Sequence, residues 1–486
     1  MKWTKARSYI LLGIFGLILI IIRIRYASPY ASTWDMVDFS LALDRFDLFM
    51  MQPHFPGYPY FILFAMFTHL WMSDPAQALS AVGAILITSA LIPSYLILNK
   101  RLPESFALIG SLVPQSLTYI WVMSTQPMSE ASAVGIFIWF LWGVDCAVRK
   151  PDKHGYVVFS SFLFSLLMGI RVSYFPLGIV LIPLWWKRWR QLKRKSIVWM
   201  DLLLFTFFQF LWVLGLILST GGFGAFVELS ISFINGHFQD WGGTALTSER
   251  SLVERLFQLV FNNLLWVGVL GKSFLSAILF IALIVLAGLN LGRMTQARWV
   301  ATLLLLTYLL WAWIGQNIEK PRHILPLIPL LLFILLDSGL QGKRRTWNRL
   351  FILTLVPFMM LQSIQGILEV KRIQAERPAS YQLIDYVENQ AGPVAIYTWE
   401  EERVMDYLDA PFYYKKLYSY SKFKEEISQL DQHRILITDR VLKGFEKQGI
   451  DVSAHVTRVA SFQSNGFVDP IYNQIKLYEW GRANTP

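Results

Sequence analysis

Charged residues and cysteine are both scarce in this sequence of 486 residues. Asp, Glu, Lys and Arg together make up 16% of the chain, whereas hydrophobic residues make up 55%. A soluble protein of this size needs a larger polar surface, so the composition excludes an ordinary soluble enzyme. The single cysteine, Cys146, excludes a disulfide framework and a cysteine-based metal site. The remaining class is an integral membrane protein, which the mean hydropathy of +0.44 also indicates.

The first apolar segment, residues 8–25, starts close to the N-terminus. It resembles a signal peptide, but it is long enough to span a bilayer and no small-residue cleavage site follows it. We therefore expect an uncleaved first transmembrane helix. Lys2, Lys5 and Arg7 precede the segment, which favours a cytoplasmic N-terminus in the plasma membrane.

The net charge of +11 does not indicate a nucleic-acid partner. The basic residues lie in short connections between apolar segments, where such residues set the topology or contact anionic lipid. Membrane lipids are therefore expected partners, and no nucleic acid is expected.

The apolar segments and the basic connections together predict a topology of about eleven spans. The basic connections at residues 100–101, 149–153, 187–195 and 343–349 then all fall on the cytoplasmic side. Residues 58–72 are placed beside the membrane, because counting them as a span would invert every later connection. The predicted spans are residues 8–25, 76–98, 106–123, 131–148, 156–170, 174–186, 198–220, 274–291, 299–315, 324–336 and 351–368.

Two long connections, residues 26–75 and 221–273, are expected on the outer side together with the C-terminal region. That region contains the strand-like runs PVAIYTW, HRILITD and NQIKLYEW and the helix-like runs SYQLIDYVENQ and KFKEEISQL. The predicted fold is therefore an α-helical polytopic membrane module, residues 1–368, followed by a small α/β extracytoplasmic domain, residues 369–486. This domain is expected to serve recognition or to support a lid.

An acidic segment follows the first span, and Asp35 is its strongest candidate for chemistry. A carboxylate just outside a membrane can accept a proton from a hydroxyl or bind a divalent cation such as Mg or Mn. It can equally be an exposed interfacial residue or a helix N-cap. Asp38, three residues on, would share a helical face with Asp35 and either assist in substrate binding or be a solvated carboxylate. Asp44 and Asp47 are expected on the wet face of an interfacial helix.

His54 stands in the proline-rich segment PHFPGYP, residues 53–59. Proline fixes φ and Gly57 allows a turn, so this loop is expected to be rigid. A rigidly held imidazole can hydrogen-bond a phosphate or orient a carboxylate. A re-entry turn with an incidental histidine would have the same sequence.

Four further polar residues are expected at the outer end of the bundle. Glu130 lies just before a predicted span and can serve as a second acid. Alternatively, Ser129 caps the N-terminus of a helix and Glu130 lies in its first turn. Arg171 lies at an outer turn, and Arg322 and His323 precede a later span. Guanidinium groups match phosphate in a bidentate manner, so the arginines are candidate phosphate ligands, with interfacial anchoring as the alternative.

Some of these segments resemble a known family. WDMVDFSLAL at residues 34–43, PHFPGYP, and Arg322 ahead of ILPLIP are similar to the GT-C superfamily of polyprenyl-phosphate-sugar-dependent glycosyltransferases. This broad group holds protein O-mannosyltransferases and aminoarabinose transferases. The resemblance covers residues 1–130, is looser at residues 322–329, and is essentially absent from the C-terminal region.

The resemblance implies roles for two acids. The catalytic or metal-coordinating acid of the first external loop corresponds to Asp35, and a second outer acid corresponds to Glu130. Family members often have an adjacent acidic pair in this loop, whereas Met36 follows Asp35 here. Metal binding by Asp35 and Glu130 therefore stays open at this point.

The resemblance also implies an activity. A sugar on a polyprenyl phosphate would be moved to a lipid, protein or wall-polymer acceptor at the outer membrane face. Asp35 would act on the acceptor hydroxyl. The other polar residues described above, Asp38, His54, Glu130, Arg171, Arg322 and His323, would then bind substrate. Displacement in one step would invert the anomeric carbon. The alternatives are a transporter or lipid flippase, which the scarcity of charge inside the spans disfavours, and a noncatalytic scaffold.

Overall fold

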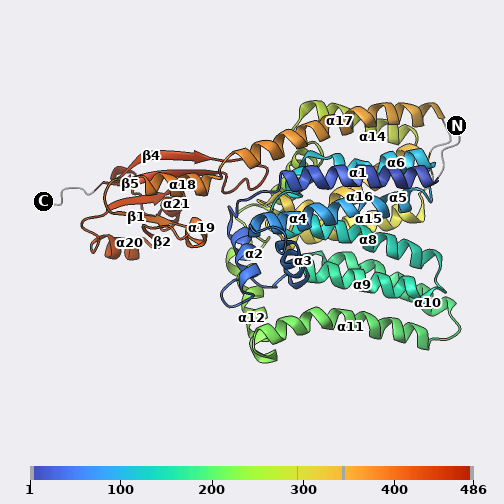
Figure 1. The fold of residues 1–486 in the computed structure, drawn as a ribbon, viewed down its shortest axis with the longest axis horizontal. Coiled ribbons are helices and arrows are strands. Elements are labelled where there is room, and N and C mark those ends of the chain that lie inside the picture. Colours follow the sequence, from blue (N-terminus) through green and yellow to red (C-terminus); the bar gives the residue numbers. More distant parts are fainter. Residues whose placement is uncertain (1–4, 293, 342–344, 482–486) are drawn as a thin grey trace.

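A computed structural model describes residues 5–292, 294–341 and 345–481. Four basic residues that support the predicted topology, Lys2, Arg293, Lys343 and Arg344, lie outside the described residues. Figure 1 shows a bundle of roughly aligned helices with a domain containing a β-sheet at one end, and the N-terminal helix begins at the other end.

The helices of the bundle follow one another closely along the chain. Up to residue 191 they are α1 (Lys5–Arg25), α2 (Trp34–Asp44), α3 (Pro59–His69), α4 (Pro75–Ser89), α5 (Leu91–Leu98), α6 (Glu104–Ser116), α7 (Thr118–Met123), α8 (Ser129–Arg149), α9 (His154–Ile170), η1 (Val172–Val180) and α10 (Leu181–Gln191). The later ones are α11 (Ser196–Ser219), α12 (Phe223–Gly236), η2 (His237–Trp241), α13 (Leu252–Phe257), η3 (Gln258–Val269), α14 (Phe274–Leu289), α15 (Gln296–Gly315), η4 (Pro321–Ile324), α16 (Leu327–Leu340) and α17 (Arg345–Ala375).

The helical membrane protein predicted from the sequence is confirmed. Among the described residues, seven helices are long and apolar enough to cross a membrane, and four shorter apolar helices accompany them. Helix α11 lies at the edge of the bundle (Figure 1). It carries exposed large apolar side chains such as Leu203, Phe207 and Leu218, as expected of a helix that faces lipid. Each predicted span lies mostly on helical structure. Four of them, residues 76–98, 106–123, 174–186 and 324–336, are divided between two helical elements.

The segment at residues 221–273 differs from the expected long connection, because most of it is helical. Leu252–Val269 is even apolar enough to count among the candidate spans. This candidate span is hard to find in the sequence, because Glu254 and Arg255 place charge inside the apolar run. In the folded chain Arg255 is buried and donates to the carbonyl groups of Gly243, Trp313 and Gln316, which satisfies the guanidinium without a carboxylate.

The C-terminal region forms the predicted small α/β domain. Its sheet has the order β2-β1-β3-β5-β4, with β1 parallel to β2 and β3, and β5 antiparallel to β3 and β4. The three predicted strands correspond to β1, β3 and β5, whereas β2 and β4 were not predicted. The elements are α18 (Ala379–Glu388), β1 (Val394–Thr398), α19 (Glu401–Tyr407), β2 (Tyr413–Lys416), α20 (Tyr420–Ile427), β3 (Arg434–Thr438), α21 (Asp439–Lys447), η5 (Ser453–His455), β4 (Val456–Gln463) and β5 (Gln474–Trp480).

This domain packs directly on the chain that leads into α2. The Tyr381 hydroxyl accepts a hydrogen bond from the backbone N–H of Ala31 at 3.2 Å, and the Ser380 hydroxyl donates to the carbonyl of Ser32 at 3.2 Å. Helix α17 runs through the predicted domain boundary at residues 368–369 and ends shortly before α18. The junction therefore places side chains of the C-terminal domain beside the acidic segment.

Candidate active site

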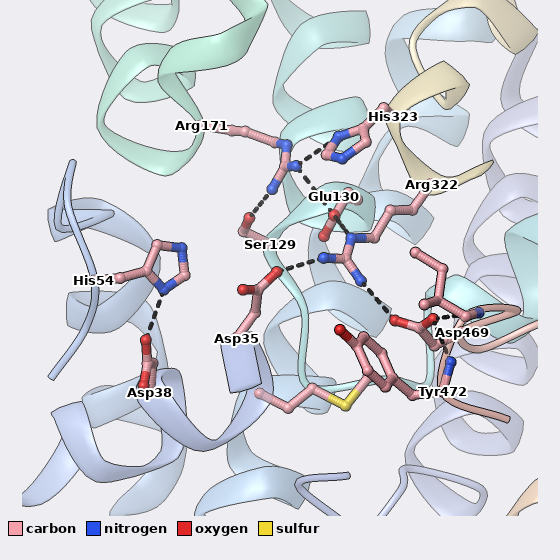
Figure 2. Close-up of polar contacts among 12 residues, drawn as sticks. Asp35, Asp38, His54, Ser129, Glu130, Arg171, Arg322, His323, Asp469 and Tyr472 are labelled. Atoms are coloured by element: carbon pink, nitrogen blue, oxygen red, sulfur yellow. Dashed lines mark hydrogen bonds and ion pairs between the residues drawn. The ribbon is translucent and has the colours of Figure 1, made fainter. Parts of the chain in front are cut away.

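Asp35 lies in the first turn of α2, where the helix N-terminus favours a carboxylate. Met36, Val37 and Phe39 are buried in the bundle and fix the orientation of this turn. The Asp35 carboxylate accepts a short hydrogen bond from Nη2 of Arg322 (Figure 2). Its side chain is 27% exposed, so a bound molecule can reach it.

Arg322, in η4, is the centre of the site. Its side chain is 4% exposed, its Nε lies 3.0 Å from Oε1 of Glu130, and its Nη1 lies 3.7 Å from Oδ2 of Asp469. Together with Asp35, three carboxylates from distant parts of the chain face one guanidinium (Figure 2). Buried charges are tolerated only when they are paired, so these groups depend on one another.

Glu130 connects this centre to a second arginine. It lies fully buried in the first turn of α8, and its Oε1 is also 3.1 Å from Nη2 of Arg171. Arg171, between α9 and η1, donates through Nη1 to the Ser129 hydroxyl at 2.9 Å, and its Nη2 lies 3.2 Å from Nδ1 of His323. The structure thus brings Asp35, Glu130, Arg171, Arg322 and His323 together at one end of the bundle.

His323 is an acceptor in this network. Burial lowers the pKa of the imidazole well below its usual value, and the neighbouring Arg171 and Arg322 lower it further. The ring is therefore neutral near pH 7, and its Nδ1 can accept a hydrogen bond from Arg171.

The charge on Asp35 is stabilised by its surroundings. Burial alone would raise the pKa of Asp35, but Lys320 and Arg322 outweigh burial, and the net pKa lies well below the ordinary range of a carboxyl group. Asp35 is consequently an anion in the neutral pH range. While Arg322 holds it, this carboxylate is a weak base.

We expect a pH-dependent stability difference between the wild type and Asp35→Asn. A depressed carboxyl pKa contributes stability above the unfolded-state pKa of about 3.9, and this contribution is lost as the pH falls below that value. The unfolding temperatures of the two proteins in detergent should differ near neutral pH, and this difference should start to shrink below about pH 3.9 and keep shrinking as the pH falls further. A difference that stays constant over this range would contradict the assigned pairing; the exposed Asp44→Asn provides the control.

Asp38 and His54 form a second cluster beside this centre, close enough for His54 to help lower the pKa of Asp35. His54 Nδ1 lies 3.0 Å from Oδ2 of Asp38, its Nε2 lies 3.0 Å from the Tyr58 hydroxyl, and Oδ1 of Asp38 accepts from Nε of Arg403 at 2.9 Å. Burial raises the pKa of Asp38, while His54 and Arg403 oppose the rise. Figure 2 shows the Asp38 and Asp35 side chains pointing to different partners.

The alternative interpretation of Asp38 as a solvated carboxylate is wrong. The side chain is fully buried, because Arg403 of α19 covers it. The i, i+3 spacing from Asp35 identifies the face of the helix but not what packs against that face. His54 contacts this carboxylate, and its role in substrate binding stays a prediction.

Arg403→Gln is expected to destabilise the contact between α19 and α2 by about 3 kcal/mol, since it removes one partner of a buried carboxylate. The measurement is the free energy of unfolding together with hydrogen exchange of α2. Arg377→Gln is the matched control, because Arg377 pairs with Asp385 in an exposed position, where a change of about 1 kcal/mol or less is expected. Equal effects of the two changes would contradict the structural role of Arg403.

Sequence reasoning missed Asp469 and Arg403, which both come from the C-terminal domain. Asp469 is held in place by a local turn, in which its Oδ1 accepts from the backbone N–H groups of Ile471 and Tyr472 at 2.8 and 3.3 Å (Figure 2). Turns of this kind are common in surface loops. Neither residue therefore carries a local signal that would mark it as part of the site.

The described residues do not fit a divalent cation at this centre. Among residues 5–292, 294–341 and 345–481, no group of three His, Cys, Asp or Glu side chains is placed to hold a metal ion. Asp35 and Glu130 both contact Arg322, so the guanidinium already supplies the positive charge between them. A cation inserted there would meet the charge of Arg322.

Comparison with known proteins gives a clear result for the fold. ArnT from Cupriavidus metallidurans, in a crystal structure bound to undecaprenyl phosphate, is 10% identical, and the match covers 98% of each chain with a TM-score of 0.56. The fold is of the GT-C type. No family model and no curated protein sequence matches the chain.

A second protein shares the GT-C fold. The oligosaccharyltransferase of Archaeoglobus fulgidus in its apo form is 12% identical and has a TM-score of 0.52, with 90% of this chain and 70% of that chain covered. The same oligosaccharyltransferase in complex with Zn and sulfate is 11% identical and has a TM-score of 0.50, with 87% and 67% covered. The fold expected from the sequence resemblance is thereby confirmed.

Within this GT-C fold, the charged centre joins the helix bundle to the C-terminal domain. Asp35, Glu130 and Arg322 come from the membrane module, and Asp469 comes from the C-terminal domain. The C-terminal domain therefore contributes a side chain to this centre, and the recognition or lid-supporting role expected for it stays a prediction.

Proposed function

We propose that this protein is a membrane glycosyltransferase that moves a sugar from a polyprenyl-phosphate donor to a hydroxyl of a cell-envelope acceptor at the outer membrane face. The observation that carries the proposal is the arrangement around Arg322, in which a partly exposed Asp35 and a buried Glu130 contact the same guanidinium. The GT-C fold and the undecaprenyl phosphate bound by the structurally similar ArnT support this class of donor.

The donor phosphate would bind at Arg322. A guanidinium can donate two parallel hydrogen bonds to a phosphate, and Arg171 and Lys320 add positive charge nearby. The phosphate would compete with Asp35 for the Nη2 group of Arg322. Glu130, which forms ion pairs with Arg322 and Arg171, would keep both arginines in place during this exchange.

Release from Arg322 would make Asp35 a stronger base. Its pKa is depressed partly by Arg322, so loss of that contact would raise the pKa toward the ordinary carboxyl range. Donor binding would thereby activate the base that the reaction needs. This order of events links phosphate binding to proton transfer.

In the reaction the acceptor oxygen would form a bond to the anomeric carbon while the bond from that carbon to the phosphate oxygen breaks. Asp35 would take the acceptor proton, and the electron pair of the broken bond would leave on the polyprenyl phosphate. Arg322 would stabilise the negative charge that develops on this phosphate. Displacement in one step inverts the anomeric centre. No step is assigned to a metal ion.

The test uses purified full-length protein in nanodiscs, a radiolabelled sugar on a polyprenyl phosphate, and a cell-envelope fraction as acceptor. Label should move to the acceptor, and free polyprenyl phosphate should appear in equal amount. Movement of intact labelled donor across the bilayer of proteoliposomes without cleavage would instead identify a flippase and overturn the proposal.

A further inference from the structure

A cavity lies in the half of the bundle that points away from Arg322 and the C-terminal domain. Its volume is about 470 Å³, and its walls come from α5, α6, α8, α15 and α16. In α8 the lining residues fall within residues 138–149, whereas Glu130, which contacts Arg322, lies in the first turn of that helix. The volume falls within the range of about 300–1,000 Å³ that is usual for cavities that bind small molecules.

The walls of this cavity are mostly apolar. Aliphatic and aromatic side chains line the part that extends toward the middle of the bundle, and polar groups are few there. The apolar lining includes Leu98, Ile138, Leu141, Val300, Leu304, Leu330 and Phe333. Such a surface suits a hydrocarbon chain rather than a polar metabolite.

Positive charge gathers at one end of the same cavity. Arg101 follows the end of α5, and Asp145 and Arg149 lie in the last turns of α8. Asp145 is contacted by Lys100 at 2.7 Å, by Arg101 at 3.1 Å and by Arg149 at 3.1 Å. Lys187 also lines the cavity, so the lining holds three cations, Arg101, Arg149 and Lys187, and one carboxylate, Asp145.

Arg101 and Arg149 differ in how firmly they are held and in how exposed they are. Arg101 is held in place by Asp145 and by the carbonyl of Ile97 at 3.1 Å, with its guanidinium 5.8 Å from the centre of the Phe333 ring. Arg149 is 43% exposed, so its charge is open to the surroundings. A fixed cation inside and an exposed cation outside would meet the two sides of one anionic headgroup.

We propose that this cavity binds an anionic phospholipid of the leaflet at that end of the bundle. One acyl chain would occupy the apolar part, and the phosphodiester would lie against Arg101, Arg149 and Lys187. Charge complementarity selects an anionic headgroup over a zwitterionic one. The site is separate from the donor site, because a lipid whose phosphate lies at Arg322 has its headgroup at the other end of the bundle. The inference therefore does not rest on the proposed function.

The test measures the unfolding temperature of the full-length protein in neutral detergent. Dioleoylphosphatidylglycerol should raise it by about 2–4 °C over an equal amount of dioleoylphosphatidylcholine. Arg149→Gln and Lys187→Gln should each remove most of this increase. Arg190→Gln is the control, since it removes the same charge at the exposed end of α10 without lining the cavity.

A second pair of variants tests the apolar part. Ala301→Trp fills the cavity from α15, whereas Leu303→Trp places the same ring on the exposed face of that helix. The phosphatidylglycerol effect should be lost in the first variant and kept in the second. Three results would overturn the proposal. The two phospholipids could stabilise the protein equally, or the phosphatidylglycerol effect could survive the charge changes. Undecaprenyl phosphate could also stabilise the protein in a way that the same charge changes abolish.

Discussion

Replacing Asp35 by asparagine is expected to lower the rate of sugar transfer by roughly 100- to 10,000-fold, the usual range for loss of a positioned general base. Asparagine has nearly the same shape, but it cannot take the acceptor proton. It also leaves Arg322 without the carboxylate that competes with the donor phosphate. Donor binding should therefore be retained or strengthened while transfer is lost. The measurements are single-turnover transfer and binding of a polyprenyl phosphate by the same preparation.

Asp44→Asn is the control for this prediction, because Asp44 ends the same helix and is exposed. It should transfer sugar at the wild-type rate. Undiminished transfer by Asp35→Asn would remove Asp35 from the chemistry. Loss of donor binding along with transfer would contradict the competition between Asp35 and phosphate, since that competition requires binding to survive.

The second large effect is expected at Arg322. Arg322→Gln leaves Asp35, Glu130 and Asp469 without the guanidinium that they share, and breaking a buried pair in this way costs about 3–5 kcal/mol of folding stability. Arg322→Lys keeps the charge but loses the planar fork, so it should fold better and still bind the donor phosphate poorly. The free energy of unfolding and donor affinity are measured on both variants.

Two further variants test whether the stability cost at Arg322 comes from its pairing with Glu130. Glu130→Gln combined with Arg322→Gln should destabilise less than the sum of the single changes, because one uncompensated charge is removed. Arg250→Gln breaks an exposed pair with Glu319 and is expected to cost about 1 kcal/mol or less. Additive effects of the first pair would show that Glu130 and Arg322 do not depend on each other.

The sequence predicted the membrane part of the site because two independent patterns agreed. Basic connections placed residues 26–75 and 321–323 on one side of the membrane, and the motifs in the first loop identified Asp35. The segments that carry Glu130, Arg171 and Arg322 are each at the end of a helix. Once their common side is known, their convergence follows from helix packing.

The missing parts depend on long-range packing. Asp469 and Arg403 enter the site because the C-terminal domain docks on α2, and no local pattern encodes that docking. The buried state of Asp38 was missed for the same reason. Residues 252–269 were missed because Glu254 and Arg255 interrupt the apolar run, although backbone carbonyl groups satisfy Arg255 in the folded chain.

The most direct test of the central claim is an experimental structure of the full-length protein with a bound polyprenyl phosphate. The phosphate is expected within hydrogen-bonding distance of the Arg322 guanidinium, with the Asp35 carboxylate displaced from Nη2 and facing the space left for an acceptor hydroxyl. Glu130 should still contact Arg322 and Arg171. A phosphate bound elsewhere, with the pair between Asp35 and Arg322 intact, would contradict the account.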